Sequence, residues 1–235
     1  MTSAGSSEFV DSRVRCLFRH DQKGRITFAN EHVGVRAPRF FLTRTPAAAC
    51  WRFRDDLSAA IADRIEEQCR EEPTCADLQE PPRHARCYRA LLEADMPIER
   101  EWIGPAYRFT RPIAAPAGAI VAITPMNTHL LVPDFADWLP DTGRCDPMVA
   151  LLREGRVVSL CASVRITPAA HEAGVETLTA FRGCGFAADV VAAWARAVRK
   201  MGAEPFYSTS WENTASQAVA RKLGLMLFGS DFHLT

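Results

Sequence analysis

The most constraining feature of the sequence is a turn with two glycines between a β-rich run and a helix. The turn reads RGCGFA over residues 182–187, and the run before it covers 174–181. The helix that follows has Val190, Val191, Trp194 and Val198 on one face, Asp189 in its first turn, Arg199 and Lys200 in its last turn, and Gly202 after its end. This periodicity and these end signals predict a buried amphipathic helix.

A strand that leads through such a turn into a helix exposes backbone N–H groups at the positive end of the helix dipole. This geometry favours an anion, and a diphosphate fits it best. A tight strand-to-helix turn that binds nothing explains an isolated G-x-G equally well, so both interpretations stay open on these residues alone.

Two other phosphate-binding motifs are excluded by their context. A dinucleotide-binding fingerprint needs an acidic residue about 20 positions later, at the end of the next strand. Here Glu204 precedes the next strand, and too little chain follows it to complete a doubly wound sheet. A Walker-type loop needs G-K-[ST], which does not occur in the sequence.

The length of 235 residues suits one large domain or two small ones. Prolines and small residues accumulate between 107 and 118, and this change predicts a boundary between domain 1–112 and domain 113–235. In the first domain, apolar residues at helical spacing predict helices over 56–72 and 83–94. The first eight residues are small and polar, so we expect them to be frayed, with regular structure from about Val14.

In the second domain, β-rich runs alternate with turn signals. The expected strands are 119–124, 148–152, 157–166, 174–181, 205–211 and 225–234, and the first of them is expected to be short and buried. Glu154-Gly155 is a tight hairpin signal between the second and third of these strands. Asn213 is placed to cap a further helix over 214–223.

Composition limits the possible partners. Hydrophobic residues make up 48% and charged residues 24%, which is typical of a folded globular chain. The 28 basic and 28 acidic residues cancel, so no whole-molecule field attracts nucleic acid or anionic lipid. No apolar run reaches the roughly 18–20 residues of a membrane helix, and the first residues lack the apolar core of a secretion signal. We therefore expect a cytoplasmic protein without nucleic-acid or membrane partners.

The cysteines do not indicate a metal site. There are eight of them, with no C-x-x-C pair and no clustered histidines at zinc-ligand spacing. The pattern predicts reduced, mostly structural thiols and no bound metal. The eight are Cys16, Cys50, Cys69, Cys75, Cys87, Cys145, Cys161 and Cys184.

Two separate motifs carry a resemblance to a known family. The segment 172–187 ends in Arg182-x-x-Gly185-x-Ala187, and the segment 213–225 begins with an asparagine and ends in K-L-G-L. In this order and about 30 residues apart, they resemble the two motifs of the GNAT acetyltransferase superfamily. The resemblance covers roughly residues 118–235. It implies an α+β (mixed α/β) fold, a GNAT-like acyl-CoA-binding domain with a central mixed sheet, together with a smaller, diverged N-terminal α/β domain.

The resemblance also implies acetyl-CoA as a co-substrate. The amides of residues 183–187 would hold its diphosphate, and the backbone of 176–178 would pair with its pantetheine arm like an added strand. The implied coenzyme-binding residues are Glu176, Thr177, Leu178, Arg182, Gly183, Cys184, Gly185, Phe186, Ala187, Asn213 and Ser216. Cys184 lies where the diphosphate goes, so we expect a loop residue and no covalent intermediate.

Catalysis in this family is direct attack of an amine on the thioester, aided by proton removal. Glu172 and Glu176 are two of the candidate catalytic residues, because positions four apart on a strand share one face. Either carboxylate can equally be solvated or paired with an arginine. Many family members have a tyrosine seven residues after the motif asparagine, but this chain has Ala220. Two nearby residues are then the candidate proton donors to the leaving thiolate: Ser216, which is the third candidate catalytic residue, and Tyr207. The alternative is that the thiolate leaves without a proton donor. His171 and His233 are lesser candidates.

The resulting expectation is an N-acetyltransferase, an acyltransferase that acetylates a small-molecule amine, as a monomer or homodimer. Two alternatives remain. Ala220 is compatible with a non-catalytic acyl-CoA-binding or sensing module. Another acyl donor, such as a longer acyl-CoA or an aminoacyl-tRNA, is the second alternative, and the arginines of 83–89 give the tRNA version its only support.

Overall fold

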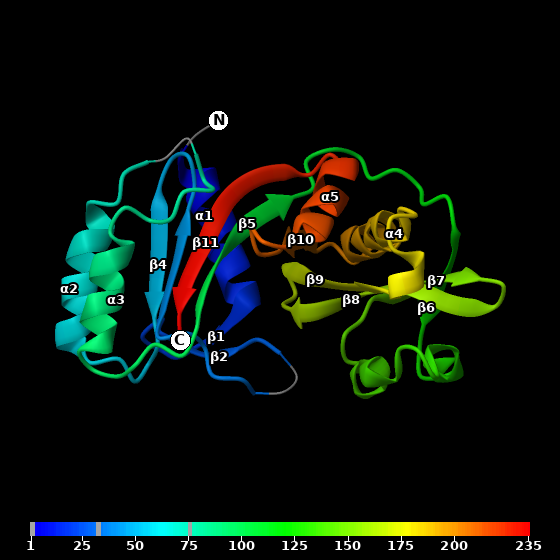
Figure 1. Ribbon diagram of the computed structural model, residues 1–235, viewed down its shortest axis with the longest axis horizontal. Helices are drawn as coiled ribbons and strands as arrows, with labels where there is room; N and C mark the ends of the chain where they lie inside the picture. Colours follow the sequence, from blue (N-terminus) through cyan, green and yellow to red (C-terminus); the bar gives the residue numbers. More distant parts are fainter. Residues whose placement is uncertain (1–2, 32–33, 75–76) are drawn as a thin grey trace.

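The structure is a computed structural model that describes residues 3–31, 34–74 and 77–235. Within these residues, nine strands form one sheet in the order β4-β3-β11-β5-β10-β9-β8-β7-β6 (Figure 1). The strands are β3 (Phe40–Arg44), β4 (Ala49–Phe53), β5 (Glu101–Arg108), β6 (Ala119–Ile123), β7 (Met148–Arg153), β8 (Arg156–Ile166), β9 (Ala170–Thr177), β10 (Glu204–Ser208) and β11 (Met226–Leu234). A small separate hairpin joins β1 (Phe18–His20) to β2 (Ile26–Ala29).

Helices cover both faces of the sheet (Figure 1). The α-helices are α1 (Ser3–Leu17), α2 (Ala59–Arg70), α3 (Ala85–Glu93), α4 (Phe186–Lys200) and α5 (Thr214–Lys222), and the 3-10 turns are η1 (Thr128–Leu131), η2 (Ala136–Asp141) and η3 (Thr179–Phe181). The mixed sheet with helices agrees with the predicted α+β fold. None of these helices combines the length and the apolar character needed to cross a bilayer.

The central helix α4 follows its sequence pattern closely. Its predicted face is buried, with Trp194 at 0% exposure against β7, β8 and β9. Asp189 lies in the first turn, and Gly202, with φ of +83°, follows the end of the helix. The hairpin between β7 and β8 is also confirmed, because Glu154 and Gly155 both have positive φ, as a two-residue hairpin turn requires.

The two helices predicted in the first half are confirmed, with shorter ends. They are α2 and α3, and they pack on one face of β3, β4 and β11. Ser58 begins α2 by accepting a hydrogen bond from the Ile61 amide at 3.4 Å. The helix therefore starts three residues later than the periodicity alone suggests.

The expected fraying is wrong for residues 3–8, while residues 1–2 lie outside the described residues. The helix α1 starts at Ser3 and packs on the opposite face of the sheet from α2 and α3. Val10, Val14 and Leu17 form its buried stripe at helical spacing. This apolar contact with the sheet, which the polar start of the sequence does not reveal, offsets the weak local preference for a helix.

Two predicted strand positions need correction. The segment 119–124 was expected to be buried, but β6 is an edge strand and most of it is exposed or half-buried. The strand before the glycine turn was expected over 174–181, but β9 ends at Thr177 and η3 follows it.

The predicted domain boundary falls in the loop 109–118, between β5 and β6. The sheet continues across it, because β11, from the end of the chain, pairs antiparallel with β3 and β5 of the first half. The division into domains 1–112 and 113–235 stays a prediction. The last strand of the chain is nevertheless built into the sheet of the first half.

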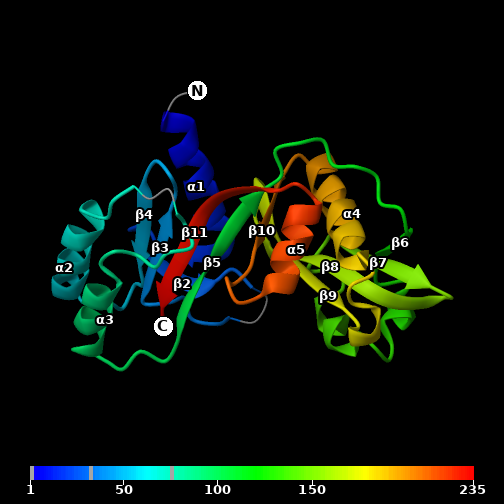
Figure 2. The same ribbon diagram turned by 45° about the horizontal axis from the view of Figure 1, so that its top comes forward.

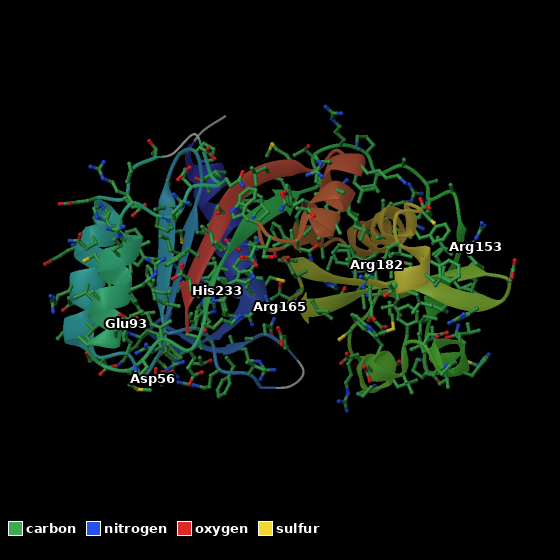
Figure 3. All side chains as sticks on the ribbon, viewed as in Figure 1. Asp56, Glu93, Arg153, Arg165, Arg182 and His233 are labelled. Atoms are coloured by element: carbon green, nitrogen blue, oxygen red, sulfur yellow. The ribbon has the colours of Figure 1, made fainter. Side chains whose placement is uncertain are left out.

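The imidazole of His233 on β11 links stability to pH. His233 is labelled in Figure 3. It stacks on Trp102 of β5, with 5.1 Å between ring centroids, and its Nδ1 atom is buried without a hydrogen-bond partner among the described residues. Burial lowers the pKa of His233 to about 4. The folded protein therefore binds this proton less readily than the unfolded chain does.

We expect the free energy of unfolding to fall as the pH drops from 6.5 to 4, because the unfolded imidazole takes up a proton that the folded one refuses. At about 1.4 kcal/mol per pH unit, the loss reaches at most about 3 kcal/mol. Urea unfolding at pH 7 and pH 5 measures it. His233→Gln should flatten the dependence, whereas His129→Gln, at an exposed histidine, should not. Equal pH dependence in both variants contradicts the prediction.

Candidate functional site

The candidate site begins where two neighbouring strands stop pairing. β9 and β10 run parallel, and their last paired residues are Glu172 and Phe206. Beyond this point β9 continues to Thr177 beside β8, and β10 continues to Ser208 beside β5. The facing edges of β9 and β10 can therefore pair with an extended ligand, as an added strand does.

A cavity of about 540 Å³ lies at this opening. Its walls come from β9, β10, the glycine turn and the adjacent helices α4 and α5, which Figure 2 shows side by side. Of the predicted coenzyme-binding residues, nine line it: Glu176, Thr177, Arg182, Gly183, Gly185, Phe186, Ala187, Asn213 and Ser216. Leu178 does not, because it packs in the core beneath β7 and β8. Cys184 also lies outside the cavity lining and is exposed.

The glycine turn forms the end of the cavity at the start of α4. Gly183 and Gly185 have φ of +78° and +85°, a conformation that other residues adopt only with strain. Gly185 is the N-cap of α4 and offers no side-chain hydrogen bond. The first amides with a helical acceptor are those of Ala188 and Asp189, which donate to the Gly185 carbonyl at 3.1 and 3.3 Å. The amides of 183–187 are therefore available to an anion.

Two cations near this turn were missed by the sequence analysis. Lys222, on the last turn of α5, lines the cavity, and its Nζ lies directly over Gly185. Arg153, at the end of β7, stacks on the Phe186 ring with 5.4 Å from its guanidinium carbon to the ring centroid. Arg153 and Arg182 are both labelled in Figure 3. The spacing of 215, 218, 219 and 222 along α5 is the helical pattern that could have indicated Lys222.

Two hydroxyl groups lie close together on the cavity wall that β10 and α5 form. The Tyr207 hydroxyl on β10 lies 2.6 Å from Ser216 Oγ on α5. Burial raises the pKa of Tyr207 to about 12, so its proton is retained at neutral pH. Asn213 accepts a hydrogen bond from the Ser216 amide at 3.0 Å, which confirms that it caps α5. Ala220 is fully buried in the core beside α4.

The two candidate carboxylates have different environments. Glu176 is exposed, and its Oε2 accepts a 2.7 Å hydrogen bond from the indole of Trp138 on η2. Glu172 is 3% exposed, and its Oε1 accepts a 2.6 Å hydrogen bond from Ser208. Its Oε2 lies 3.8 Å from Nε of Arg13, an ion-pair distance. The alternative of pairing with an arginine thus describes Glu172 and not Glu176.

His171 and the described cysteines do not line the cavity. His171 is buried, and its Nδ1 lies 2.8 Å from Ser163 Oγ, which also accepts from the Trp194 indole. Seven cysteines are free thiols, while Cys75 lies outside the described residues. No group of three or more possible metal ligands occurs in the described part of the chain.

Comparison with known proteins gives one family match. Residues 149–229 match the GNAT acetyltransferase family model, from β7 into β11. No curated protein matches the sequence.

Solved structures give the same fold at low identity. An acetyltransferase of the GNAT family from Colwellia psychrerythraea is 13% identical over 79% of this chain and 76% of that chain, with a TM-score of 0.51. A GCN5-related N-acetyltransferase-like protein from Streptococcus suis is 16% identical over 85% of each chain, with a TM-score of 0.50. A GNAT-family protein from Novosphingobium aromaticivorans, described as a putative acetyltransferase, is 19% identical over 58% of this chain and 65% of that chain, with a TM-score of 0.48. The alignment thus spans just under two thirds of the Novosphingobium protein.

The position of Lys222 leads to a prediction for phosphate binding. Lys222→Met should weaken coenzyme A binding about tenfold or more, because a hydrogen bond to a charged group contributes about 1.5–3 kcal/mol. Calorimetric titration measures the affinity. Lys200→Met is the matched control, since Lys200 ends α4, and the glycine turn lies at its other end. Pantetheine, which has no diphosphate, should bind both variants equally. An unchanged affinity for coenzyme A in Lys222→Met contradicts the assignment.

Proposed function

From the premise that residues 149–229 form a GNAT acetyltransferase domain, we propose that the protein is an acetyl-CoA-dependent N-acetyltransferase acting on a small-molecule amine. Membership of this domain family supports acyl-CoA-dependent acetyl transfer in general. The specific acceptor class is the proposal.

One observation supports the proposal above all: the cavity connects the separated edges of β9 and β10 with the backbone amides of the glycine turn, where an anion can bind. The edges of β9 and β10 beyond Glu172 suit an extended amide-bearing arm, and the cavity leads from them to the free amides of 183–187. A coenzyme A thioester has this combination, a pantetheine arm that pairs as a strand and a diphosphate that needs N–H donors.

The reaction needs little from the protein beyond position and proton transfer. The amine nitrogen forms a bond to the acetyl carbon, and the carbon–sulfur bond breaks with its electron pair on sulfur. A carboxylate of β9 takes the proton lost by the nitrogen, and the thiolate is protonated to give coenzyme A. Tyr207 is suited to supply that proton because its hydroxyl stays protonated at neutral pH and contacts Ser216 at the cavity wall.

One observation favours a second candidate, a non-catalytic acyl-CoA-binding module. The position at which many family members have a tyrosine is Ala220, which is buried in the core and has no proton to donate. This candidate predicts coenzyme binding without turnover, so measuring both binding and turnover separates the two candidates.

Thermal unfolding with acetyl-CoA, followed by thiol release against a panel of amines, tests the proposal. At one hundred times its Kd a ligand adds about 2.7 kcal/mol of stability, which gives a visible rise in Tm. Gly185→Glu should abolish the rise, because it puts a strained, anionic residue among the phosphate-binding amides. Gly155→Glu is the matched control, since Gly155 has nearly the same φ of +78° but lies in the β7–β8 turn.

Amine-dependent thiol release by the wild type supports the transferase. A rise in Tm without thiol release for any amine supports the binding module. No rise in Tm at millimolar acetyl-CoA contradicts both candidates, and an equal loss in both glycine variants contradicts the placement of the coenzyme on the turn.

A further inference from the structure

Two aromatic rings flank the glycine turn, at the end of the cavity that the start of α4 forms. Phe181 belongs to η3, before the turn, and Phe186 is the first residue of α4, after it. Both residues line the cavity, and their ring centroids are 6.4 Å apart. The backbone amides of 183–187, which are available to an anion, therefore lie between two aromatic side chains.

Arg153, at the end of β7, reaches the same place from the neighbouring hairpin (Figure 3). Its guanidinium carbon lies over the Phe186 ring, 5.4 Å from the ring centroid. The ring engages one side of the guanidinium and leaves its five N–H donors unused, because the guanidinium forms no hydrogen bond or ion pair within the part of the chain that the structure describes. A guanidinium with free donors beside a cavity suits a phosphate group, which accepts two parallel hydrogen bonds from it.

Arg156, across the same hairpin, offers a direct comparison. It lies opposite Arg153 in the register of β7 and β8, and its guanidinium donates two hydrogen bonds of 2.6 Å to the carboxylate of Asp134. Arg153 is equally exposed, but it lies against a ring that lines the cavity and has no carboxylate partner in the described chain. The positive charge of Arg153 is therefore left for a ligand at this end of the cavity.

The ligand proposed for this cavity has more phosphate than the turn alone can bind. Besides its diphosphate, coenzyme A carries a phosphate monoester on the 3′ carbon of its ribose, with about 1.5–2 negative charges at neutral pH. The amides of 183–187 and Lys222, whose Nζ lies over Gly185, suit the diphosphate. Arg182 is turned towards β9, where its Nε donates to the Thr177 carbonyl at 3.3 Å.

The order of groups in the coenzyme indicates where its second phosphate lies. The ribose follows the diphosphate on the side away from the pantetheine arm, so its phosphate needs a cation beyond the turn. In the sheet, β7 lies two strands from β9, on the side away from β10 and the opening. Arg153 thus approaches the turn from the side opposite to the pantetheine opening.

We propose that Arg153 binds the 3′-phosphate of the coenzyme, so that the protein selects the 3′-phosphorylated coenzyme over its dephospho form. The proposal rests on the proposed function and extends it to a further part of the ligand. Phe186 holds the guanidinium near the cavity before the ligand arrives, which lowers the entropy lost on binding. Arg153 acts in binding alone and touches no reacting atom.

The test is a calorimetric titration with coenzyme A and with dephospho-coenzyme A, which lacks only the 3′-phosphate. The wild type should bind coenzyme A about tenfold more tightly, the lower end for hydrogen bonds to a charged group, because Arg153 is exposed to solvent. Arg153→Met keeps a side chain over Phe186 but loses the charge, so it should bind both forms equally. Arg153→Lys should recover part of the preference, because lysine binds phosphate as a point charge without the fork.

Arg156→Met is the matched control, since Arg156 is an exposed arginine of the same hairpin that binds Asp134 instead. It should keep the preference of the wild type. The affinity for dephospho-coenzyme A should stay within about twofold in all three variants. This second titration shows that the cavity is intact in each variant, so a lost preference is not a folding defect.

The outcomes separate this proposal from the proposed function. A wild type that binds neither form overturns the proposed function, and this proposal with it. A wild type that binds both forms equally, or a preference that survives in Arg153→Met, overturns the role of Arg153 alone. An equal loss of affinity for both forms in Arg153→Met, or the same loss of preference in Arg156→Met, also overturns it, because the effect is then not specific to the 3′-phosphate or to Arg153.

Discussion

The structure depends on an interruption of backbone pairing between two parallel strands. β9 and β10 exchange backbone contacts as far as Glu172 and Phe206, and each then follows its other neighbour in the sheet. Backbone N–H and C=O groups that lose their partner must find another. The gap between the two strands can therefore accept an extended ligand, and the cavity, the glycine turn and the start of α4 are arranged along it.

The first half of the chain is part of this arrangement and not an appendage to it. β5 pairs with both β10 and β11, so the last strand of the chain is held inside the sheet of the first half. The same sheet carries α1, and α1 brings Arg13 to the back of the opening. The first half of the chain thus shapes the surroundings of residues 149–229, which match the family model, through one continuous sheet.

Charge in this protein is local and not global. The formal net charge is zero, yet Lys222, Arg182 and Arg153 lie near the glycine turn, while a cluster of Arg13 and the two carboxylates that it faces is buried behind the opening. Screening by salt weakens exposed charges but acts much less on buried ones. The exposed cations suit the binding of an exchangeable phosphate-bearing ligand, whereas the buried cluster suits fixed geometry.

What the sequence determined by itself is local. The buried face of α4, the Glu154-Gly155 turn, the Asn213 cap and the glycine turn all follow from residues within a few positions of one another, where periodicity, positive φ and capping act directly. The glycine-turn end of the cavity was therefore predictable from the sequence. The start of α1 was not, because contact with the sheet decides it.

Only the tertiary structure decided which distant residues meet. Arg13 and Asp231 are 218 positions apart, and Trp138 and Glu176 are 38 apart, so no local pattern records either contact. The same holds for Lys222 over Gly185. Glu172 and Glu176 have the same sequence signal, two acids on one strand face, and their different surroundings come from α1, β10 and η2 packing against that face. Such contacts depend on chain topology, which residue spacing along the sequence does not encode.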